Sequence, residues 1–372
     1  MNIVTSMCAF LVLCSISLLA QENGPWNAPL MWAEETAPDV FSAPRIFQDS
    51  SGVPCVVRKG ASDTLLCAFQ WFREPRNAPT WDRVAVKVST DDGVTWTQPV
   101  PIVIDGIPAG YQRPFDPTLV SFRDSIRIYF SSSVRMPMGG LDSLVNTYSA
   151  VGTDGIHFRF EPGARFDHAT RPVIDPAVIH LNNTWLFVAP IGAPQEGAYQ
   201  AISNDGLVFS ELQNIPSDNQ HNWTGNLMYD EDGTLQFYGS GPMMWRVAYI
   251  GFGSWGNFRS IGVQGGDPSA VARKESGRGR WIVFVGPRYT TSIRNDGNDN
   301  NDVMTLYPNP CVDVCHLPAK FTNEAVIFCT DIIGQTWTYK VIGGTVDLSA
   351  LSVGTWMVHT EDWTVIGIIA HK

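Results

Sequence analysis

Five passages of the chain repeat one pattern, in which a short apolar strand is followed by turn residues and a second apolar strand. Successive passages begin about 40 to 60 residues apart, which is the length of one four-stranded propeller blade with its loops. The sequence therefore predicts an all-β fold, with a five-bladed β-propeller over residues 25–294. The paired strands span 53–57 and 64–69, 116–120 and 126–130, 175–179 and 184–188, 225–229 and 234–238, and 267–271 and 280–284.

The segments on either side of these passages complete the predicted architecture. The stretch from Trp32 to Phe47 is placed to donate the strand that closes the ring, which removes an open sheet edge. Residues 295–302 are polar and contain glycine, as expected for a linker. Alternating strands follow, so we predict a small C-terminal β-sandwich over residues 303–372. Only 16% of the residues are charged, against about 25% in an average soluble domain, which is typical of a turn-rich β protein.

A second repeated element lies between these passages. Residues 89–96 fit the Asp-box pattern S-x-D-x-G-x-x-W, residues 203–209 have the shorter form S-x-D-G-x-x-F, and residues 152–158 are a degenerate copy. In such a turn the aspartate accepts hydrogen bonds from backbone amides, the glycine takes a positive φ, and the aromatic side chain packs into the next blade. We therefore expect Asp91, Asp154 and Asp205 to be structural.

The N-terminal segment predicts export. Residues 1–20 carry no charge and contain an apolar stretch, after which the chain turns polar. This pattern indicates a secretory signal peptide; an uncleaved membrane anchor is the alternative, although the stretch is short for a span. The net charge of −11 is not concentrated in a tail, so nucleic acid is not an expected partner. We predict neither a cofactor nor a metal site, since the acids and cysteines lack metal-binding spacing.

The C-terminal segment carries a second export signal. It begins Tyr307-Pro308-Asn309-Pro310, continues with DIIG at 331–334 and a strand pattern over 346–358, and ends on Lys372. It resembles the C-terminal sorting domain of the type IX (Por) secretion system of Bacteroidetes. The resemblance implies recognition by that secretion machinery and attachment to the cell surface or release. We therefore expect a secreted or surface-attached protein without an integral membrane span in the mature chain. The alternative is an ordinary sugar-binding β-sandwich.

Three aspartates begin predicted first strands. Asp116, Asp175 and Asp267 are each followed by proline, and Arg113 and Arg171 precede two of them. First strands line the channel of a propeller, and ligands bind at its mouth, where loops from all blades converge. Asp-Pro at a strand start also has a structural explanation, because proline needs no ladder donor there and aspartate accepts a turn hydrogen bond. Both interpretations stay open.

These Asp-Pro strand starts, combined with the S-x-D-G-x-x-F turn, resemble the five-bladed propeller glycoside hydrolases, the arabinanase and β-xylosidase group. The resemblance implies cleavage of a glycosidic bond between an acid and a base carboxyl group. Asp116 matches the family pattern, whereas Val53 stands where the base aspartate is expected and Asp175 where the acid glutamate is expected. Glu196, in the loop after the third blade's second strand, is the candidate replacement acid.

The first predicted blade, with its Asp-box, also resembles sialidases and other BNR-repeat proteins. Sialidases hold the substrate carboxylate with three arginines, a fork geometry that lysine does not provide. Gly52 stands where the first of these arginines would fall. Sialidases also have six blades, against the five counted in this chain.

We therefore expect a carbohydrate-active propeller that hydrolyses glycosidic bonds of an extracellular glycan. Two alternatives stay open. One is a non-catalytic surface propeller that binds carbohydrate or protein, and the other is a phosphorylase-like enzyme whose arginines hold phosphate. The catalytic candidates are Asp116, Asp175, Asp267 and Glu196, and the substrate-binding candidates are Arg113, Arg171, His221, Trp71 and Arg288.

Overall fold

The computed structural model describes residues 28–73, 75, 78–135, 144–192, 196–274 and 279–287, and then 314–316, 326–330, 336–342, 345–351, 354–359 and 365–371. All regular elements in these residues are strands, so this part of the chain offers no helix that could cross a membrane. The chain divides into two compact units, Met1–Arg288 and Tyr289–Lys372. The predicted signal peptide, the linker at 295–302 and residues 307–310 lie outside the described residues.

Five sheets make up the first unit, and each corresponds to one predicted repeat. The first blade contains β4 (Ser51–Arg58), β5 (Leu65–Trp71), β6 (Arg83–Ser89) and β7 (Val100–Pro101). The second contains β9 (Phe115–Phe122), β10 (Ser125–Ser133), β11 (Val145–Gly152), β12 (His157–Phe166) and β8 (Val103–Asp105), which runs parallel to β12. The third contains β13 (Ala177–Leu181), β14 (Thr184–Pro190), β15 (Ala198–Ser203) and β16 (Ser210–Glu211).

The last two blades differ in how their outer strands are supplied. In the fourth, β20 (Ser254–Trp255) and β21 (Arg259–Ser260) both pair with β19 (Trp245–Gly251), which follows β17 (Asn222–Tyr229) and β18 (Leu235–Ser240). The fifth contains β22 (Gly266–Ala272), β23 (Arg280–Val285), β1 (Leu30–Ala37), β2 (Val40–Phe41) and β3 (Arg45–Gln48).

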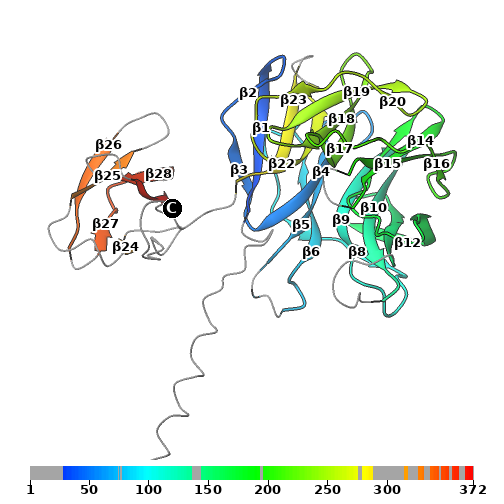
Figure 1. Ribbon diagram of the computed structural model, residues 1–372. Coiled ribbons are helices and arrows are strands. Elements are labelled where there is room, and N and C mark those ends of the chain that lie inside the picture. Colours follow the sequence, from blue (N-terminus) through cyan, green and yellow to red (C-terminus); the bar gives the residue numbers. More distant parts are fainter. Residues whose placement is uncertain are drawn as a thin grey trace, which may run out of the picture. The chain divides into compact units, whose positions relative to one another are not determined.

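The first strands of the five sheets form a closed ring. β4, β9, β13, β17 and β22 touch one another in this order, and β22 touches β4 again. Sheets arranged radially around such a ring are the blades of a five-bladed β-propeller (Figure 1). The predicted fold class is therefore confirmed.

The N-terminal strand closes the ring. β1 pairs antiparallel with β23, from Leu30 opposite Val285 to Glu34 opposite Trp281. The fifth blade thus takes two strands from the end of the propeller and the next from its beginning, which confirms the closing role predicted for the stretch after Trp32. The Trp32 and Trp281 rings stack with their centroids 5.1 Å apart.

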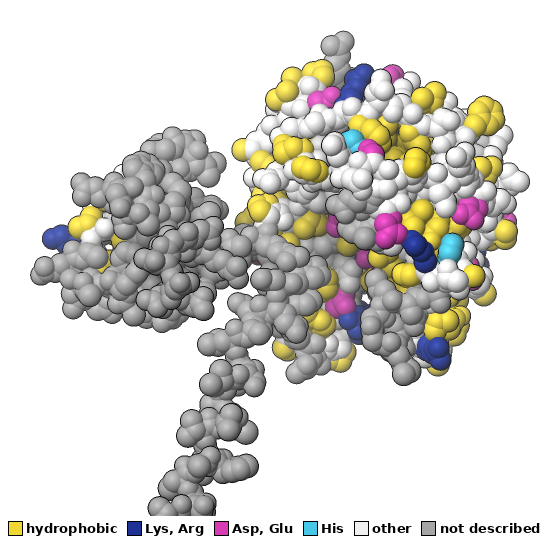
Figure 2. All heavy atoms as spheres, viewed as in Figure 1, with side chains coloured by type: hydrophobic (Ala, Val, Ile, Leu, Met, Phe, Trp, Pro, Cys, Tyr) yellow, Lys and Arg dark blue, Asp and Glu magenta, His cyan; other side chains and the backbone are white. Residues whose placement is uncertain are grey.

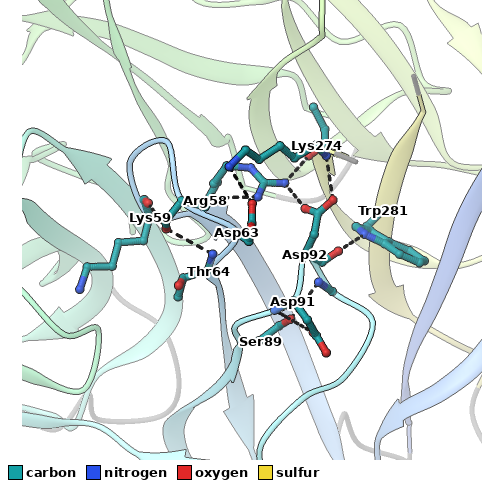
Figure 3. Close-up of polar contacts among 12 residues, drawn as sticks. Arg58, Lys59, Asp63, Thr64, Ser89, Asp91, Asp92, Lys274 and Trp281 are labelled. Carbon is teal, nitrogen blue, oxygen red and sulfur yellow. Dashed lines mark hydrogen bonds and ion pairs between the residues drawn. The ribbon is translucent and has the colours of Figure 1, made fainter. Parts of the chain in front are cut away.

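A polar network joins the first blade to the fifth (Figure 3). Arg58, at the end of β4, pairs with the buried carboxylate of Asp92 and donates a 2.8 Å hydrogen bond to the Ala272 carbonyl of β22. Asp92 Oδ2 accepts a 2.8 Å bond from the Lys274 backbone N–H, and the Asp92 carbonyl accepts a 2.6 Å bond from Trp281 Nε1. Asp92 therefore accepts hydrogen bonds from donors in both the first and the fifth blade.

Apolar side chains fill the space between each pair of neighbouring blades. The cluster between the first and second blades contains Leu66 and Ile128, and the cluster between the third and fourth contains Leu186 and Phe237. The other three interfaces have equivalent clusters. Because each cluster takes side chains from two blades, separating any pair of blades would expose apolar surface on both.

The aspartates of the three repeated turns bind the turn backbone. Asp205 Oδ1 accepts hydrogen bonds of 2.8 and 3.0 Å from the backbone N–H groups of Leu207 and Val208. Asp91 accepts one from Thr95, and Asp154 accepts two. These carboxylates therefore hold turns between the third and fourth strands of their blades.

The turns lie against the preceding blade. A Cβ added at Gly93 would come within 2.8 Å of Trp281 in the fifth blade, and one added at Gly155 within 2.7 Å of Leu66 in the first. Phe209 of the third blade packs on Tyr129 of the second, with ring centroids 6.2 Å apart. The expectation that the aromatic packs into the next blade is wrong, because each turn covers the second strand of the blade before it.

The second unit is a small β-sandwich. β26, β25, β28 and β29 form one antiparallel sheet, and β24 and β27 form the other. Ile327 of β25 and Val346 of β27 share a buried cluster, so the two sheets have a common core. The strands are β24 (Val314–His316), β25 (Val326–Thr330), β26 (Thr336–Lys340), β27 (Thr345–Asp347), β28 (Gly354–His359) and β29 (Val365–His371).

Candidate functional site

Four blades begin with a non-glycine residue in the left-handed backbone conformation. Val53, Asp116, Asp175 and Asp267 have φ values of 48°, 50°, 50° and 46°, and each precedes a proline. In β4, β9 and β22 the pairing register also shifts at this point, as at a β-bulge. Such backbone is costly, most of all for β-branched Val53, and it is typical of functional sites.

The ring brings three of these side chains together at one end of the propeller axis. The Asp175 backbone N–H lies 3.4 Å from Asp116 Oδ2 and donates to it. The carboxyl groups of Asp175 and Asp116 also hydrogen-bond to each other, and the charge of Asp267 acts on both. The predicted convergence of Asp116, Asp175 and Asp267 therefore occurs, with the closest contact between the first two.

Burial raises the pKa of all three carboxyl groups. The pKa of Asp116, whose side chain is buried, rises to about 7, and the neighbouring Ser131 hydroxyl partly opposes this rise. Burial and the charges of Asp116 and Asp267 hold the pKa of Asp175 well above its usual range. The pKa of Asp267 is also raised by burial, and the neighbouring Thr224 hydroxyl partly opposes this rise. The site therefore retains a proton at pH values where exposed aspartates are ionised.

A hydrogen-bonded floor closes the axis beneath these carboxyl groups. Asn226 Nδ2 donates a 3.0 Å hydrogen bond to the Pro54 carbonyl, and Asn226 Oδ1 lies 3.2 Å from the Thr118 hydroxyl. Thr118 also donates to the Pro176 carbonyl. Asn226 and Thr118 are both buried. Two side chains and two backbone carbonyls, from four different blades, thus meet on the axis.

Asp82 adds a fourth carboxylate at the rim. It pairs with Arg113 and with the Gln70 side-chain amide, and its negative charge contributes to the raised pKa of Asp116. Sequence reasoning identified Arg113 but missed Asp82, Ser131 and Thr224. Asp82 stands directly before β6, and no repeated motif marks that position.

Arg171 and Glu196 form a separate pair on the rim. Their Nη1 and Oε2 atoms are 2.5 Å apart, and both side chains are 47% exposed. Glu196 therefore stands in solvent, and its described hydrogen bond goes to Arg171 rather than to the three aspartates. Arg113 and Arg171 are each neutralised by an acid.

The described contacts of His221 and Trp71 go to residues outside the carboxyl cluster. His221 pairs with Asp218 and stacks on Phe258, with ring centroids 3.7 Å apart. Trp71 is half-buried at the end of β5, with the Arg73 guanidinium 5.4 Å from its ring centroid. Arg288 lies outside the described residues.

The acids are not arranged as a metal site. Among the described residues, no group of three or more His, Cys, Asp or Glu side chains could hold a metal ion. Raised carboxyl pKa values are a property of sites for proton transfer.

A cavity of about 550 Å³ lies beside Asp267. Its lining comes from the loops and strand ends of the first, fourth and fifth blades, and it includes five glycines, two prolines and the Gln264 side chain. Its volume falls in the range of about 300–1,000 Å³ that is typical of small-molecule sites. The residues are Ala28, Gly52, Val53, Gly241, Pro242, Gln264, Gly265, Gly266, Asp267, Val285, Gly286 and Pro287.

Comparison with known proteins gave structural neighbours alone. No family model matches the chain, and no curated protein matches it. A protein of unknown function from Dyadobacter fermentans is similar at 17% identity over 78% of this chain and 83% of its own, with a TM-score of 0.44. The GH32 β-fructofuranosidase of Bombyx mori is similar at 14% identity over 85% and 78%, with a TM-score of 0.46. The GH43_1 enzyme of Xanthomonas citri is similar at 12% identity over 63% and 86%, with a TM-score of 0.45.

Proposed function

We propose that this chain hydrolyses a glycosidic bond of an extracellular glycan at the mouth of the propeller axis. The observation that carries the proposal is the cluster of Asp116, Asp175 and Asp267, which come from three blades, have raised pKa values and sit on a closed floor. Glycoside hydrolysis needs a carboxyl group that stays protonated near neutral pH and a second that is ionised. The cluster can supply both.

The environment of each carboxyl group suggests its role. Asp175, whose pKa is held well above its usual range, donates its proton to the glycosidic oxygen as the bond to the anomeric carbon breaks. Asp267 accepts the proton of the attacking water, because its pKa is raised less far from its usual range than that of Asp175. Asp116 shares a hydrogen bond with Asp175 and so tunes and orients the donor.

The test is a screen of the full chain against plant, algal and host glycans, with release of reducing sugar as the readout. Asp175→Asn and Asp267→Asn should each lower the rate by about 10²–10⁴. Asp124→Asn, in the exposed turn between β9 and β10, is the matched control and should keep the wild-type rate. Equal rates in all four proteins would overturn the proposal, and cleavage that requires added phosphate would favour a phosphorylase instead.

One observation favours a non-catalytic sugar- or protein-binding propeller. The first blade holds Val53, and the fourth Gly225, at the position that carries an acid in the other three blades, so the ring has two carboxyl groups fewer than its five blades allow. Binding without release, unchanged in Asp175→Asn, would establish this alternative.

We further propose that the chain is exported and surface-attached or released. The support is the uncharged apolar N-terminal segment and the resemblance of residues 303–372 to type IX sorting domains. Deleting residues 303–372 in the native host should leave the propeller in the periplasm, and continued appearance at the cell surface would contradict the proposal.

A further inference from the structure

The five repeats allow one position to be compared around the ring. It is the residue directly before the positive-φ residue of each first strand, which is Val53, Asp116, Asp175, Gly225 and Asp267 in the five blades. The second, third and fourth blades carry the side chains of Phe115, Ile174 and Thr224 there. The first and fifth blades carry Gly52 and Gly266. These two blades are neighbours, because β4 touches β22. Both glycines line the 550 Å³ cavity beside Asp267.

The protein itself does not require glycine at these two positions. Neither Gly52 nor Gly266 has a positive φ. A Cβ added at Gly52 would have its nearest neighbour, Phe72, 4.0 Å away, and one added at Gly266 would lie 3.9 Å from the Ser240 hydroxyl. Both contacts are ordinary van der Waals distances, so alanine fits at either site.

The other glycines of the cavity differ in this respect. A Cβ at Gly265 would approach Phe284 to 2.4 Å, one at Gly286 would approach Met31 to 2.5 Å, and one at Gly241 would approach the Gln220 carbonyl to 2.8 Å. Packing explains these three. Gly52 and Gly266 are left with the other common reason for glycine, the close approach of a ligand to the backbone.

The lining also indicates the chemical class of the ligand. In the described part of the chain, the Asp267 carboxyl is the one charged group that lines the cavity, and Gln264 adds an uncharged amide. Two of the three arginines predicted to bind substrate, Arg113 and Arg171, are bound to Asp82 and Glu196, and the third, Arg288, lies outside the described residues. Among the described lining residues, a ligand carboxylate or sulfate would meet the Asp267 carboxyl and no cation, whereas sugar hydroxyls can bond to the amide, the carboxyl and the backbone.

We infer that the cavity between the fifth and first blades binds an uncharged sugar unit, which lies against the backbone at Gly52 and Gly266. The inference rests on the proposed function for the identity of the ligand as a sugar. It adds where the sugar ring binds, and it excludes anionic sugars such as sialic and uronic acids as ligands. Asp267 connects the proposed catalytic site with the cavity, because it belongs to the carboxyl cluster and also lines the cavity.

The test measures binding by titration calorimetry on the full chain. The uncharged probes are disaccharides of xylose, arabinose, galactose and glucose, and the anionic probes are sialyllactose and digalacturonic acid. We expect an uncharged probe to bind, and Gly52→Ala and Gly266→Ala each to weaken that binding by about tenfold or more, because a methyl group then occupies the ligand's space. Gly256→Ala is the matched control: its Cβ would lie 3.5 Å from the Ala248 carbonyl, and it has no positive φ and does not line the cavity.

Thermal unfolding of all three variants separates lost binding from lost folding, and midpoints equal to wild type are expected. Stronger binding of the anionic probes, no binding of any uncharged probe, or unchanged affinity in both cavity variants would overturn the inference. Binding that responds to the glycine variants without any hydrolysis would keep the inference and reject the proposed hydrolase. Hydrolysis at the wild-type rate in both cavity variants would keep the proposed hydrolase and reject the inference.

Discussion

Asn226 of the fourth blade and Pro54 of the first are joined across the propeller axis by a 3.0 Å hydrogen bond from Nδ2 to the carbonyl oxygen. The two residues are 172 positions apart in the chain, and Asn226 is buried. Its Oδ1 faces the Thr118 hydroxyl of the second blade. A single amide therefore connects three blades just beneath the carboxyl cluster.

Replacing this amide should destabilise the fold. Asn226→Ala leaves the Pro54 carbonyl without its donor in a buried place, at a cost of about 1–3 kcal/mol in the free energy of unfolding. Urea denaturation of the full chain measures it. Asn183→Ala, in the exposed turn between β13 and β14, is the control and should change stability by less than about 0.5 kcal/mol. Equal losses in the two variants would show that the floor contributes nothing.

The raised pKa of Asp116 makes stability depend on pH. The folded protein holds this proton up to about pH 7, whereas the unfolded chain releases it near pH 3.9. Between these values the folded state binds more protons than the unfolded state, so the free energy of unfolding falls as pH rises. Asp116→Asn should reduce the difference in unfolding free energy between pH 5 and pH 7.5. Urea curves at both pH values check this, and a variant with the wild-type difference would contradict the assignment.

The repeats predicted well where the three aspartates lie, because the repeated pattern determines the path of the backbone. Asp-Pro at three strand starts placed Asp116, Asp175 and Asp267 at equivalent points of a ring, and equivalent points of first strands meet on the axis. The closing strand followed from the need to pair an open edge.

The contacts that tune the site do not repeat, and sequence alone could not reveal them. Asp82 and Ser131 act on Asp116 from a loop and a second strand of two different blades. Asn226 reaches Pro54 only because the ring closes. The left-handed φ of Val53 was also hidden, since a β-branched residue rarely adopts it.

The rate of the proposed hydrolysis should also depend on pH, because the reaction needs a protonated carboxyl group. Burial and the charges of Asp116 and Asp267 hold the pKa of the donor Asp175 well above its usual range, so the donor keeps its proton at pH values where an exposed aspartate has lost it. Activity measured from pH 4 to 9 should therefore fall on the alkaline side of its optimum, and a rate that stays constant to pH 9 would argue against a carboxyl donor.

Glu196→Gln distinguishes the rim pair from the cluster. Glu196 is 47% exposed and bonded to Arg171, so its loss should change the rate less than about twofold and leave the pH profile in place. A loss comparable to that in Asp175→Asn would make Glu196 the proton donor, as the resemblance to propeller hydrolases first suggested.

Two aspartates in the polar network between the first and fifth blades differ in how deeply they are buried (Figure 3). Asp92 is 3% exposed and binds Arg58 and the Lys274 backbone, whereas Asp63 is 51% exposed and pairs with the Lys274 side chain. Asp92→Ala leaves a largely buried guanidinium without its counter-charge, so we expect a loss of about 3–5 kcal/mol in the free energy of unfolding. Asp63→Ala removes a solvent-screened pair and should cost less than about 1 kcal/mol. Urea denaturation compares the two variants. Because β1 and β23 are also held together by their backbone pairing and by the stacked rings of Trp32 and Trp281, the Asp92 variant should still fold. Similar small losses in both variants would mean that apolar packing alone closes the ring.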